Sequence, residues 1–163
     1  MTSKKQKDSV LVAESSKVLS KLMCPALEKA GYDVTLVGDG LEAIKFCFEK
    51  KPLCVICDTD LPKLDGWQIC SVIKDASEIS GIPFILVTAN DLKENDFTAE
   101  NSYAEKVMSL NGENLDELLS SVQEMCAYRK DVLAAEAAEL ETAEAAESGK
   151  AAPKNAAPDK DKS

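Results

Sequence analysis

The sequence predicts an α/β domain in which a five-stranded parallel sheet is covered by helices on both faces. Short apolar, β-branched runs alternate with helix-period segments from residue 9 to about residue 127. These runs are apolar throughout rather than at every second position, as strands buried on both faces require. With 45% hydrophobic and 29% charged residues, the 163-residue chain can bury one core of this kind.

The first strand and helix are bounded by recognisable local signals. Residues 10–13 form a short apolar run, and Ser16 can cap a following helix whose apolar residues recur at helical spacing as far as Gly31. Pro25 lies within that helix and should kink or break it, because proline cannot donate a backbone hydrogen bond. The remaining elements follow the same alternation: strands over 33–37, 53–57, 82–87 and 107–110, helices over 40–51, 67–76 and from 114 onward, and only a weak or irregular helix within 90–104.

Charge and residue usage exclude several classes of function. The 29 acidic and 19 basic residues give a formal net charge of −10, so we expect no nucleic acid partner, which would need clustered Lys and Arg. The chain has no histidine, which excludes Ser-His-Asp triads and histidine-ligated zinc. No secretory signal and no run near ~20 apolar residues is present, so we expect a cytoplasmic protein without membrane contact.

The six cysteines are predicted to be reduced, buried and structural. Cys54 and Cys57 match a C-x-x-C spacing, but they lie within a predicted strand. Alternation along that strand would point the two sulfurs to opposite faces of the sheet. The spacing therefore does not indicate a redox or metal site.

Both ends of the chain differ in composition from the predicted domain at 9–127. Residues 1–8 are basic and expected to be disordered, residues 128–148 are rich in Ala and Glu and predict a helical extension, and residues 149–163 predict a disordered tail. Four residues spaced by seven could form the seam of a weak homodimer: Leu119, Cys126, Leu133 and Leu140. Arg129 and Glu136 interrupt that stripe, which favours a solvated helix instead.

Polar residues follow three of the predicted strands. Glu14 and Ser15 follow the first strand, Asp58 and Asp60 the third, and Thr88 the fourth. In an open parallel sheet, ligands bind at the carboxyl ends of the strands. Clustered carboxylates repel each other unless a cation joins them, and Mg²⁺ is the usual oxygen-liganded choice. Such a carboxylate with a hydroxyl donor opposite can take and hold a phosphoryl group.

At this point residues 10 to about 127 resemble the receiver domain of bacterial two-component response regulators. The motifs that carry the resemblance occur in family order and at family spacing. They are Val10-Leu-Val-Ala-Glu-Ser-Ser16, Leu27-Glu-Lys-Ala-Gly-Tyr32, Gly38-Asp-Gly-Leu-Glu-Ala43, Cys57-Asp-Thr-Asp-Leu-Pro-Lys-Leu-Asp-Gly66 and Ile82-Pro-Phe-Ile-Leu-Val-Thr-Ala89.

The resemblance implies a doubly wound, flavodoxin-like sheet of order 2-1-3-4-5 and a set of residue roles. Asp58 would accept a phosphoryl group from a histidine kinase or phosphotransfer protein. Glu14, Asp58 and the backbone carbonyl of Asp60 would bind Mg²⁺, and Thr88 would be the hydroxyl that closes on the phosphoryl group. With no output domain expected after residue 127, the output would be contact with an unknown partner protein. The family surface for that contact is the fourth helix, fifth strand and fifth helix.

Three departures from the family pattern bear on this site. Ser15 replaces the second acidic residue, which should weaken Mg²⁺ binding because affinity scales with ligand charge. The family lysine after the fifth strand falls near Asn111, and Lys106 lies several residues too early. The aromatic residue of the fifth strand is replaced by Val107 or Met108, with Tyr103 as a poor substitute.

Several alternatives remain open from the sequence. The domain could be a pseudo-receiver, an interaction module that works without phosphorylation. Asp58 and Thr88 could be, respectively, a loop carboxylate that caps the next turn and an ordinary strand-end residue. The side chain of Asp60 could supplement the metal site or tune hydrolysis of the phosphoryl group. A more distant alternative is a haloacid-dehalogenase-type phosphatase, in which Asp58 would be the nucleophile and Asp60 the acid.

Overall fold

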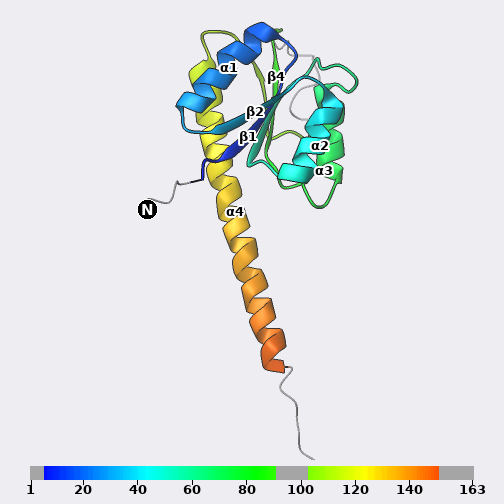
Figure 1. Cartoon of the computed structure of the whole chain (residues 1–163), viewed down its shortest axis with the longest axis vertical. Coiled ribbons are helices and arrows are strands. Elements are labelled where there is room, and N and C mark those ends of the chain that lie inside the picture. The colour runs from blue at the N-terminus through cyan, green and yellow to red at the C-terminus, as the bar shows by residue number, and fades with distance from the viewer. Residues whose placement is uncertain (1–5, 91–102, 151–163) are drawn as a thin grey trace, which may run out of the picture. The chain divides into compact units, whose positions relative to one another are not determined.

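The computed structural model describes residues 6–90 and 103–150, with the side chains of 149–150 left out. Its elements alternate as predicted: β1 (Ser9–Ala13), α1 (Lys17–Lys29), β2 (Asp33–Val37), α2 (Gly40–Lys50), β3 (Cys54–Asp58), α3 (Gly66–Asp75), β4 (Phe84–Thr88), β5 (Lys106–Ser109) and α4 (Leu115–Lys150) (Figure 1). The weak helix expected within 90–104 falls almost wholly on residues 91–102, outside the described part of the chain, as do most of the two expected disordered ends.

The five strands form one all-parallel sheet of order β2-β1-β3-β4-β5, which confirms the predicted fold class. The three inner strands are almost wholly buried, whereas the edge strands β2 and β5 are partly exposed. This difference explains why the inner strands are apolar at nearly every position.

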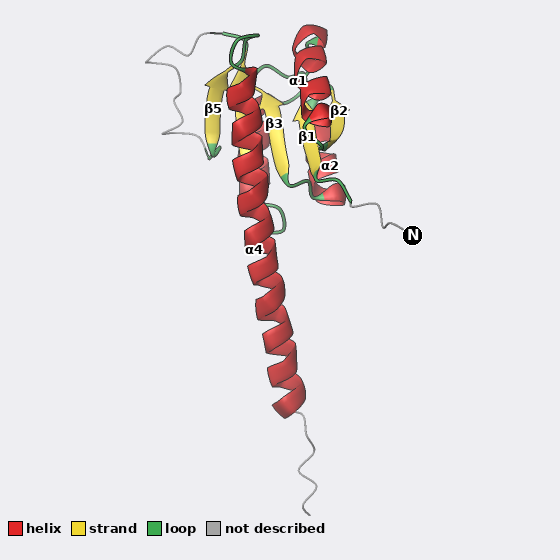
Figure 2. Cartoon of the chain, turned by 90° about the vertical axis from the view of Figure 1, so that its left-hand side faces the viewer, coloured by secondary structure: helices red, strands yellow, loops and turns green. Residues whose placement is uncertain are grey.

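Helices cover both faces of the sheet, each over its own apolar cluster. Buried residues of α2 and α3 pack on one face, and buried residues of α1 and the first part of α4 pack on the other. Figure 2 shows α1 and α4 on the same side of the sheet. Cys57 belongs to the first cluster and Cys54 to the second, so the two sulfurs of the C-x-x-C spacing lie on opposite faces as predicted.

Two strands end one residue later than the sequence indicated, which matters for the site. The strand β4 begins at Phe84, so Ile82 and Pro83, which were predicted to belong to it, precede it. The Pro83 carbonyl nevertheless accepts a hydrogen bond from the Val55 N–H of β3 at 2.9 Å. At the other end, the Thr59 N–H donates to the Val87 carbonyl at 2.9 Å, so pairing continues through Asp58. Asp58 and Thr88 are therefore the last residues of β3 and β4.

The expected break at Pro25 does not occur, since α1 continues through it to Lys29. Ser16 caps the helix as predicted, its hydroxyl accepting from the Leu19 N–H at 3.4 Å. Pro25 leaves the carbonyl of Lys21 without its usual helical donor. Both residues are exposed, so water can satisfy that carbonyl and the helix tolerates the proline.

The chain divides into two compact units, residues 1–130 and residues 131–163. The first unit holds the sheet, the helices α1 to α3 and the beginning of α4. In the second unit the structure describes the rest of α4, an exposed helix of mostly Ala and Glu. None of the described helices combines the length and apolar character needed to cross a membrane.

Candidate functional site

Asp58 and Glu14 lie at the same level of neighbouring strands. In the register of β1 with β3, Ala13 pairs with Cys57, so the next residues, Glu14 and Asp58, follow side by side at the carboxyl edge. Glu14 is 3% exposed and Asp58 is 7% exposed. The sequence predicted that these two carboxylates meet, and the parallel register brings them together.

The carboxylate of Glu14 is only half satisfied. Its Oε1 accepts a hydrogen bond from the Ser16 N–H at 2.7 Å. Its Oε2 is buried and has no hydrogen-bond partner within the described part of the chain. Burial raises the pKa of Glu14 from 4.5 to about 7; the Ser16 N–H opposes that rise, and the charge of nearby Asp58 adds to it. A buried carboxylate oxygen that lacks a donor and faces a second carboxylate is the arrangement a cation would satisfy.

Thr88 stands on the other side of Asp58. Asp58 pairs with Val87 in the register of β3 with β4, which places Thr88 one residue further along the same edge. Thr88 is 6% exposed, and its Oγ1 accepts from the Asn90 N–H at 3.2 Å. Because its oxygen already accepts that bond, the hydroxyl proton remains to be donated toward a group above the edge.

The loop after β3 is held down at several points. Within it, the Asp60 N–H donates to Asp58 Oδ1 at 3.2 Å, while the Asp60 side chain is exposed. Asp65 forms a capping box with Gln68 at the start of α3. Gly66 packs so closely that a Cβ there would overlap the Asp58 carbonyl oxygen and approach Leu86 Cδ2 to 2.7 Å. The loop therefore fixes the backbone around the Asp58 carboxylate.

One anchor of this loop has no signal in the sequence. Lys63 adopts a left-handed backbone conformation with φ 69°. Its ammonium lies 3.0 Å from the carboxylate of Asp39, the residue that caps α2. These residues are 24 positions apart, and no local spacing in the sequence signals such a pair. The ion pair lowers the pKa of Asp39, after the larger effect of the Glu42 N–H.

The three sequence departures can be located in the structure. Ser15 is exposed beside Glu14. The Oδ1 of Asn111 accepts from the N–H groups of Glu113 and Asn114, at 2.9 and 3.1 Å, so it shapes the turn before α4. Lys106 begins β5 and pairs with Ile85 of β4. Thr88 pairs with Ser109, so Lys106 lies three residues away from the carboxyl edge.

The side chain of Lys106 pairs with residues of α4 and not with the site. Its ammonium lies 2.8 Å from Glu117 Oε1 and 2.8 Å from Ser121 Oγ. Of the residues considered for the aromatic position, Met108 is buried, Val107 is half-buried, and Tyr103 is 68% exposed. The described part of the chain thus supplies neither the lysine nor a buried aromatic in β5.

The residues present fit Mg²⁺ with a minimal set of ligands. Among the described residues no three acidic or thiol side chains converge on one point that could hold a metal ion. Mg²⁺ needs fewer, because it commonly binds through one or two carboxylates and keeps several waters. Glu14 and Asp58 are two such carboxylates, and the unpartnered Glu14 Oε2 is the atom a cation would satisfy.

A comparison with protein families shows which family the chain belongs to. The family model described as "Response regulator receiver domain" matches residues 10–123. The chain belongs to the response regulator receiver domain family. Receivers are signalling proteins that accept a phosphoryl group rather than enzymes in the ordinary sense, so the phosphatase alternative has no support.

Individual relatives place this receiver near known examples. It is 33% identical over 85 residues to the polar-differentiation response regulator DivK of Brucella anthropi, covering 52% of this chain and 69% of DivK. The receiver domain of the sensor histidine kinase PA1611 of Pseudomonas aeruginosa, solved with a magnesium ion in its active-site cleft, has the same fold at 24% identity. The match has a TM-score of 0.67 and covers 75% of this chain and 99% of that one. TrrA of Thermotoga maritima, solved with Mg²⁺ and BeF, matches with a TM-score of 0.63 at 24% identity, over 72% of this chain and 98% of that one.

Proposed function

We propose that this receiver accepts a phosphoryl group on Asp58 from the phosphohistidine of a histidine kinase or phosphotransfer protein, and signals by contact with a partner protein. The observation that carries the proposal is the pair of buried carboxylates at the sheet edge, one of them with an oxygen that lacks a hydrogen-bond donor. Membership of the receiver family and the similarity to DivK support it.

Each residue of the site has a separate role in this proposal. A carboxylate oxygen of Asp58 forms a bond to phosphorus as the bond from phosphorus to the histidine nitrogen breaks. Glu14, Asp58 and the backbone carbonyl of Asp60 would hold Mg²⁺, which when bound supplies positive charge against the phosphoryl oxygens. The Thr88 hydroxyl donates to the phosphoryl group, a contact that an unphosphorylated Asp58 cannot offer.

We propose further that the Mg²⁺ site is weaker than a site with two acidic residues after β1. Ser15 contributes no charge, and affinity for a hard cation falls as the charge of its ligands falls. Mg²⁺ bound in the solved receiver of PA1611 supports the expectation that receivers of this fold use the ion.

A second function, a pseudo-receiver that binds its partner without phosphorylation, is favoured by one specific observation. Lys106 is paired with Glu117, and Asn111 shapes a turn, so neither supplies positive charge to the phosphoryl site. Slow or absent phosphorylation would follow from that loss.

The deciding experiment is the intact mass of the full chain after incubation with acetyl phosphate and Mg²⁺. Wild type is expected to gain one phosphoryl group and Asp58→Asn none. Asp33→Asn is the matched control, since Asp33 is an exposed aspartate at the opposite end of its strand, and it is expected to behave like wild type. No gain in folded wild-type protein would overturn phosphotransfer and support the pseudo-receiver. Calorimetric titration of Mg²⁺ into wild type and Glu14→Gln tests the metal ligands separately.

A further inference from the structure

The loop between β3 and α3 is fastened to the beginning of α2 by an ion pair. Lys63 of the loop lies with its Nζ 3.0 Å from Oδ2 of Asp39, the residue that caps α2. The other oxygen of the same carboxylate, Oδ1, accepts a hydrogen bond from the Glu42 N–H at 2.9 Å. Asp39 therefore caps the helix with one oxygen and holds the loop with the other.

The backbones of the two segments meet at the same place. The Gly40 N–H donates to the Pro62 carbonyl at 3.3 Å. A Cβ at Gly40 would lie 2.7 Å from the Leu64 carbonyl oxygen and 2.8 Å from Leu64 Cβ. This contact leaves no room for a side chain at the first residue of α2, so the loop lies directly against the beginning of the helix.

The backbone turn at Lys63 is strained. Lys63 has φ 69°, and the N–H of the next residue, Leu64, donates to the carbonyl of the preceding residue, Pro62, at 2.9 Å. A hydrogen bond of this kind across a residue with positive φ makes a γ-turn that is rare and costly for an L-amino acid. Such strain persists only where surrounding contacts hold it, and strained residues cluster at functional sites. The ion pair and the contact with Gly40 are two constraints that hold this turn.

The strained turn belongs to the same loop as the proposed metal ligands. Asp60 lies three residues before Lys63, and its N–H donates to Asp58 Oδ1 at 3.2 Å. The loop is closed at its base by a hydrogen bond from the Gly66 N–H to the Thr59 carbonyl at 3.1 Å. With the base fixed in this way, a displacement of Lys63 away from α2 has to be taken up by residues 60–65. These residues include the Asp60 carbonyl.

We propose that the Lys63–Asp39 ion pair is a positioning contact for Mg²⁺ binding, because it holds the loop against α2 so that the Asp60 carbonyl and the Asp58 carboxylate face one cation. This inference rests on the proposed function, since it concerns the same metal site. Lys63 and Asp39 act through the loop and not as ligands. The beginning of α2 is thereby coupled to the phosphoacceptor, although α2 supplies no ligand.

Positioning and a simple effect of charge on Mg²⁺ affinity differ in sign. If Lys63 and Asp39 acted only through the electrostatic field at the cation, loss of the lysine would strengthen binding and loss of the aspartate charge would weaken it. If the pair positions the loop, loss of either charge weakens binding. Loss of both then weakens it no further, because the two residues work through one contact. Asp39→Asn is the suitable variant, since Asn caps a helix as well as Asp does.

The test is an NMR titration of the full chain with Mg²⁺ in wild type, Lys63→Met, Asp39→Asn and the double variant. Each of the three variants is expected to bind Mg²⁺ about 2- to 5-fold more weakly than wild type, the range of a partly exposed ion pair. Lys63→Arg keeps the charge and is expected to bind like wild type. Tighter or unchanged binding by Lys63→Met, or losses that add in the double variant, would refute the proposal.

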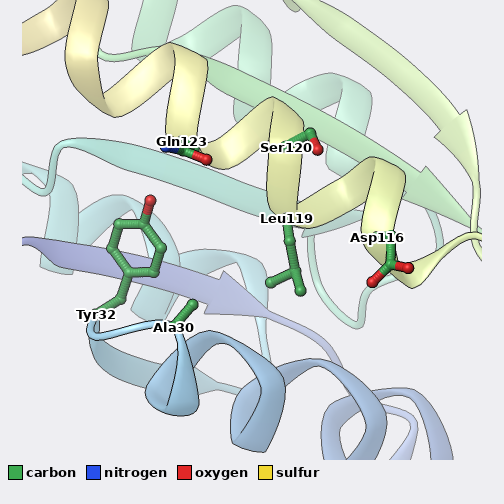
Figure 3. A pocket seen from close by; sticks show the side chains of 6 residues that line it. All are labelled: Ala30, Tyr32, Asp116, Leu119, Ser120 and Gln123. Carbon is green, nitrogen blue, oxygen red and sulfur yellow. The ribbon is translucent and has the colours of Figure 1, made fainter.

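Each charge change has a matched control. Lys45→Met removes an exposed lysine from α2 itself, where Lys45 lies 4.0 Å from Glu49. Asp116→Asn removes an exposed carboxylate from the first turn of α4, on the wall of a hollow between the end of α1 and α4 (Figure 3). That helix packs on the opposite face of the sheet from α2. Both controls are expected to bind Mg²⁺ like wild type, and an equal loss in them would refute the proposal.

A second readout needs no metal. Exchange of the Asp60 amide hydrogen with water is expected to quicken about 2- to 5-fold in Lys63→Met and in Asp39→Asn, but not in Lys63→Arg. The Asn90 amide is the internal comparison, because it donates to Thr88 Oγ1 at the same distance of 3.2 Å and at the same edge of the sheet. Its rate is expected to stay unchanged. Equal acceleration of both amides, or none at Asp60, would refute a role specific to the loop.

Failure of this proposal can be told apart from failure of the proposed function. Wild type that binds Mg²⁺ but gains no phosphoryl group from acetyl phosphate overturns phosphotransfer and leaves the positioning role supported by weaker binding in the variants. Phosphorylated wild type whose variants bind Mg²⁺ with unchanged affinity overturns only the positioning role. Folded wild type that binds no Mg²⁺ refutes the positioning role whatever its mass.

Discussion

Replacing Glu14 by Gln should change the pH dependence of stability in a defined direction. Burial raises the pKa of Glu14 in the folded protein from 4.5 to about 7. In the unfolded chain Glu14 ionises near its ordinary pKa, so between pH 4.5 and pH 7 the folded state holds a proton that the unfolded state releases. The free energy of unfolding of wild type therefore falls as the pH rises through this window, relative to a chain without this carboxyl.

The size of the effect follows from the pKa values. A rise from 4.5 to about 7 corresponds to about 3 kcal/mol at ~1.36 kcal/mol per pKa unit. The variant Glu14→Gln is neutral at every pH, and its amide oxygen can still accept from the Ser16 N–H. Without metal, its stability relative to wild type should rise by about 3 kcal/mol between pH 4.5 and pH 7.5. Other carboxylates cancel, because they are common to both proteins.

Urea unfolding followed by Trp67 fluorescence measures this difference, in a chelating buffer at pH 4.5 and pH 7.5. Glu28→Gln is the matched control, since Glu28 is exposed on α1, and its difference from wild type should stay flat across the same range. Mg²⁺ added at pH 7.5 should stabilise wild type and leave Glu14→Gln nearly unchanged. An equal difference between wild type and Glu14→Gln at both pH values would refute the assignment of the raised pKa to Glu14.

Three further substitutions or truncations test other parts of the structure. Gly66→Ala should lower the free energy of unfolding by about 2 kcal/mol, because its Cβ would overlap the backbone at the end of β3, whereas Gly112→Ala has nothing within 4 Å and should change little in the same urea assay. Glu105→Gln should cost about 1 kcal/mol, because it removes the charged partner of Lys74, which is 11% exposed and 2.5 Å away but also donates to the carbonyls of Ser80 and Ile82. A double-mutant cycle with Lys74→Met should recover part of the loss, and strictly additive costs would contradict the pair. Truncation after Arg129 should leave the protein monomeric in sedimentation equilibrium, because every charged residue from 131 to 148 is acidic and two such helices repel; a full chain that is dimeric while the truncation is monomeric would contradict this and support the weak homodimer.

The fold could be predicted because its signals are local and repeated. Buried parallel strands must be apolar at nearly every position. The intervening helices can be recognised from the helical spacing of their apolar residues and from caps such as Ser16. The positions of Asp58 and Thr88 were predictable for a related reason, since the carboxyl ends of parallel strands share one edge. The exact strand ends were not, because they depend on pairing across the sheet, such as the Thr59 N–H to the Val87 carbonyl.

Side-chain pairs between distant segments could not be predicted. Lys63 reaches Asp39 and Lys106 reaches Glu117 only because the folded backbone brings their segments together. By contrast, the separation of Cys54 and Cys57 could be predicted, because alternation along one strand places their sulfurs on opposite faces of the sheet. A pattern within one element predicts that element, whereas a contact between elements depends on their register.

The contacts of Lys106 and Asn111 set the chemistry that the proposed site must use. Lys106 is held by Glu117 on α4, and the turn before that helix uses the side chain of Asn111. Since neither of these residues brings positive charge to the proposed phosphoryl group on Asp58, metal binding through Glu14 would have to supply that charge within the described part of the chain. Phosphorylation should then depend more steeply on Mg²⁺ concentration than in a receiver that has both cations. Within the second function, the same two carboxylates would simply remain a destabilised pair, and their pH-dependent cost in stability would persist when Mg²⁺ is added.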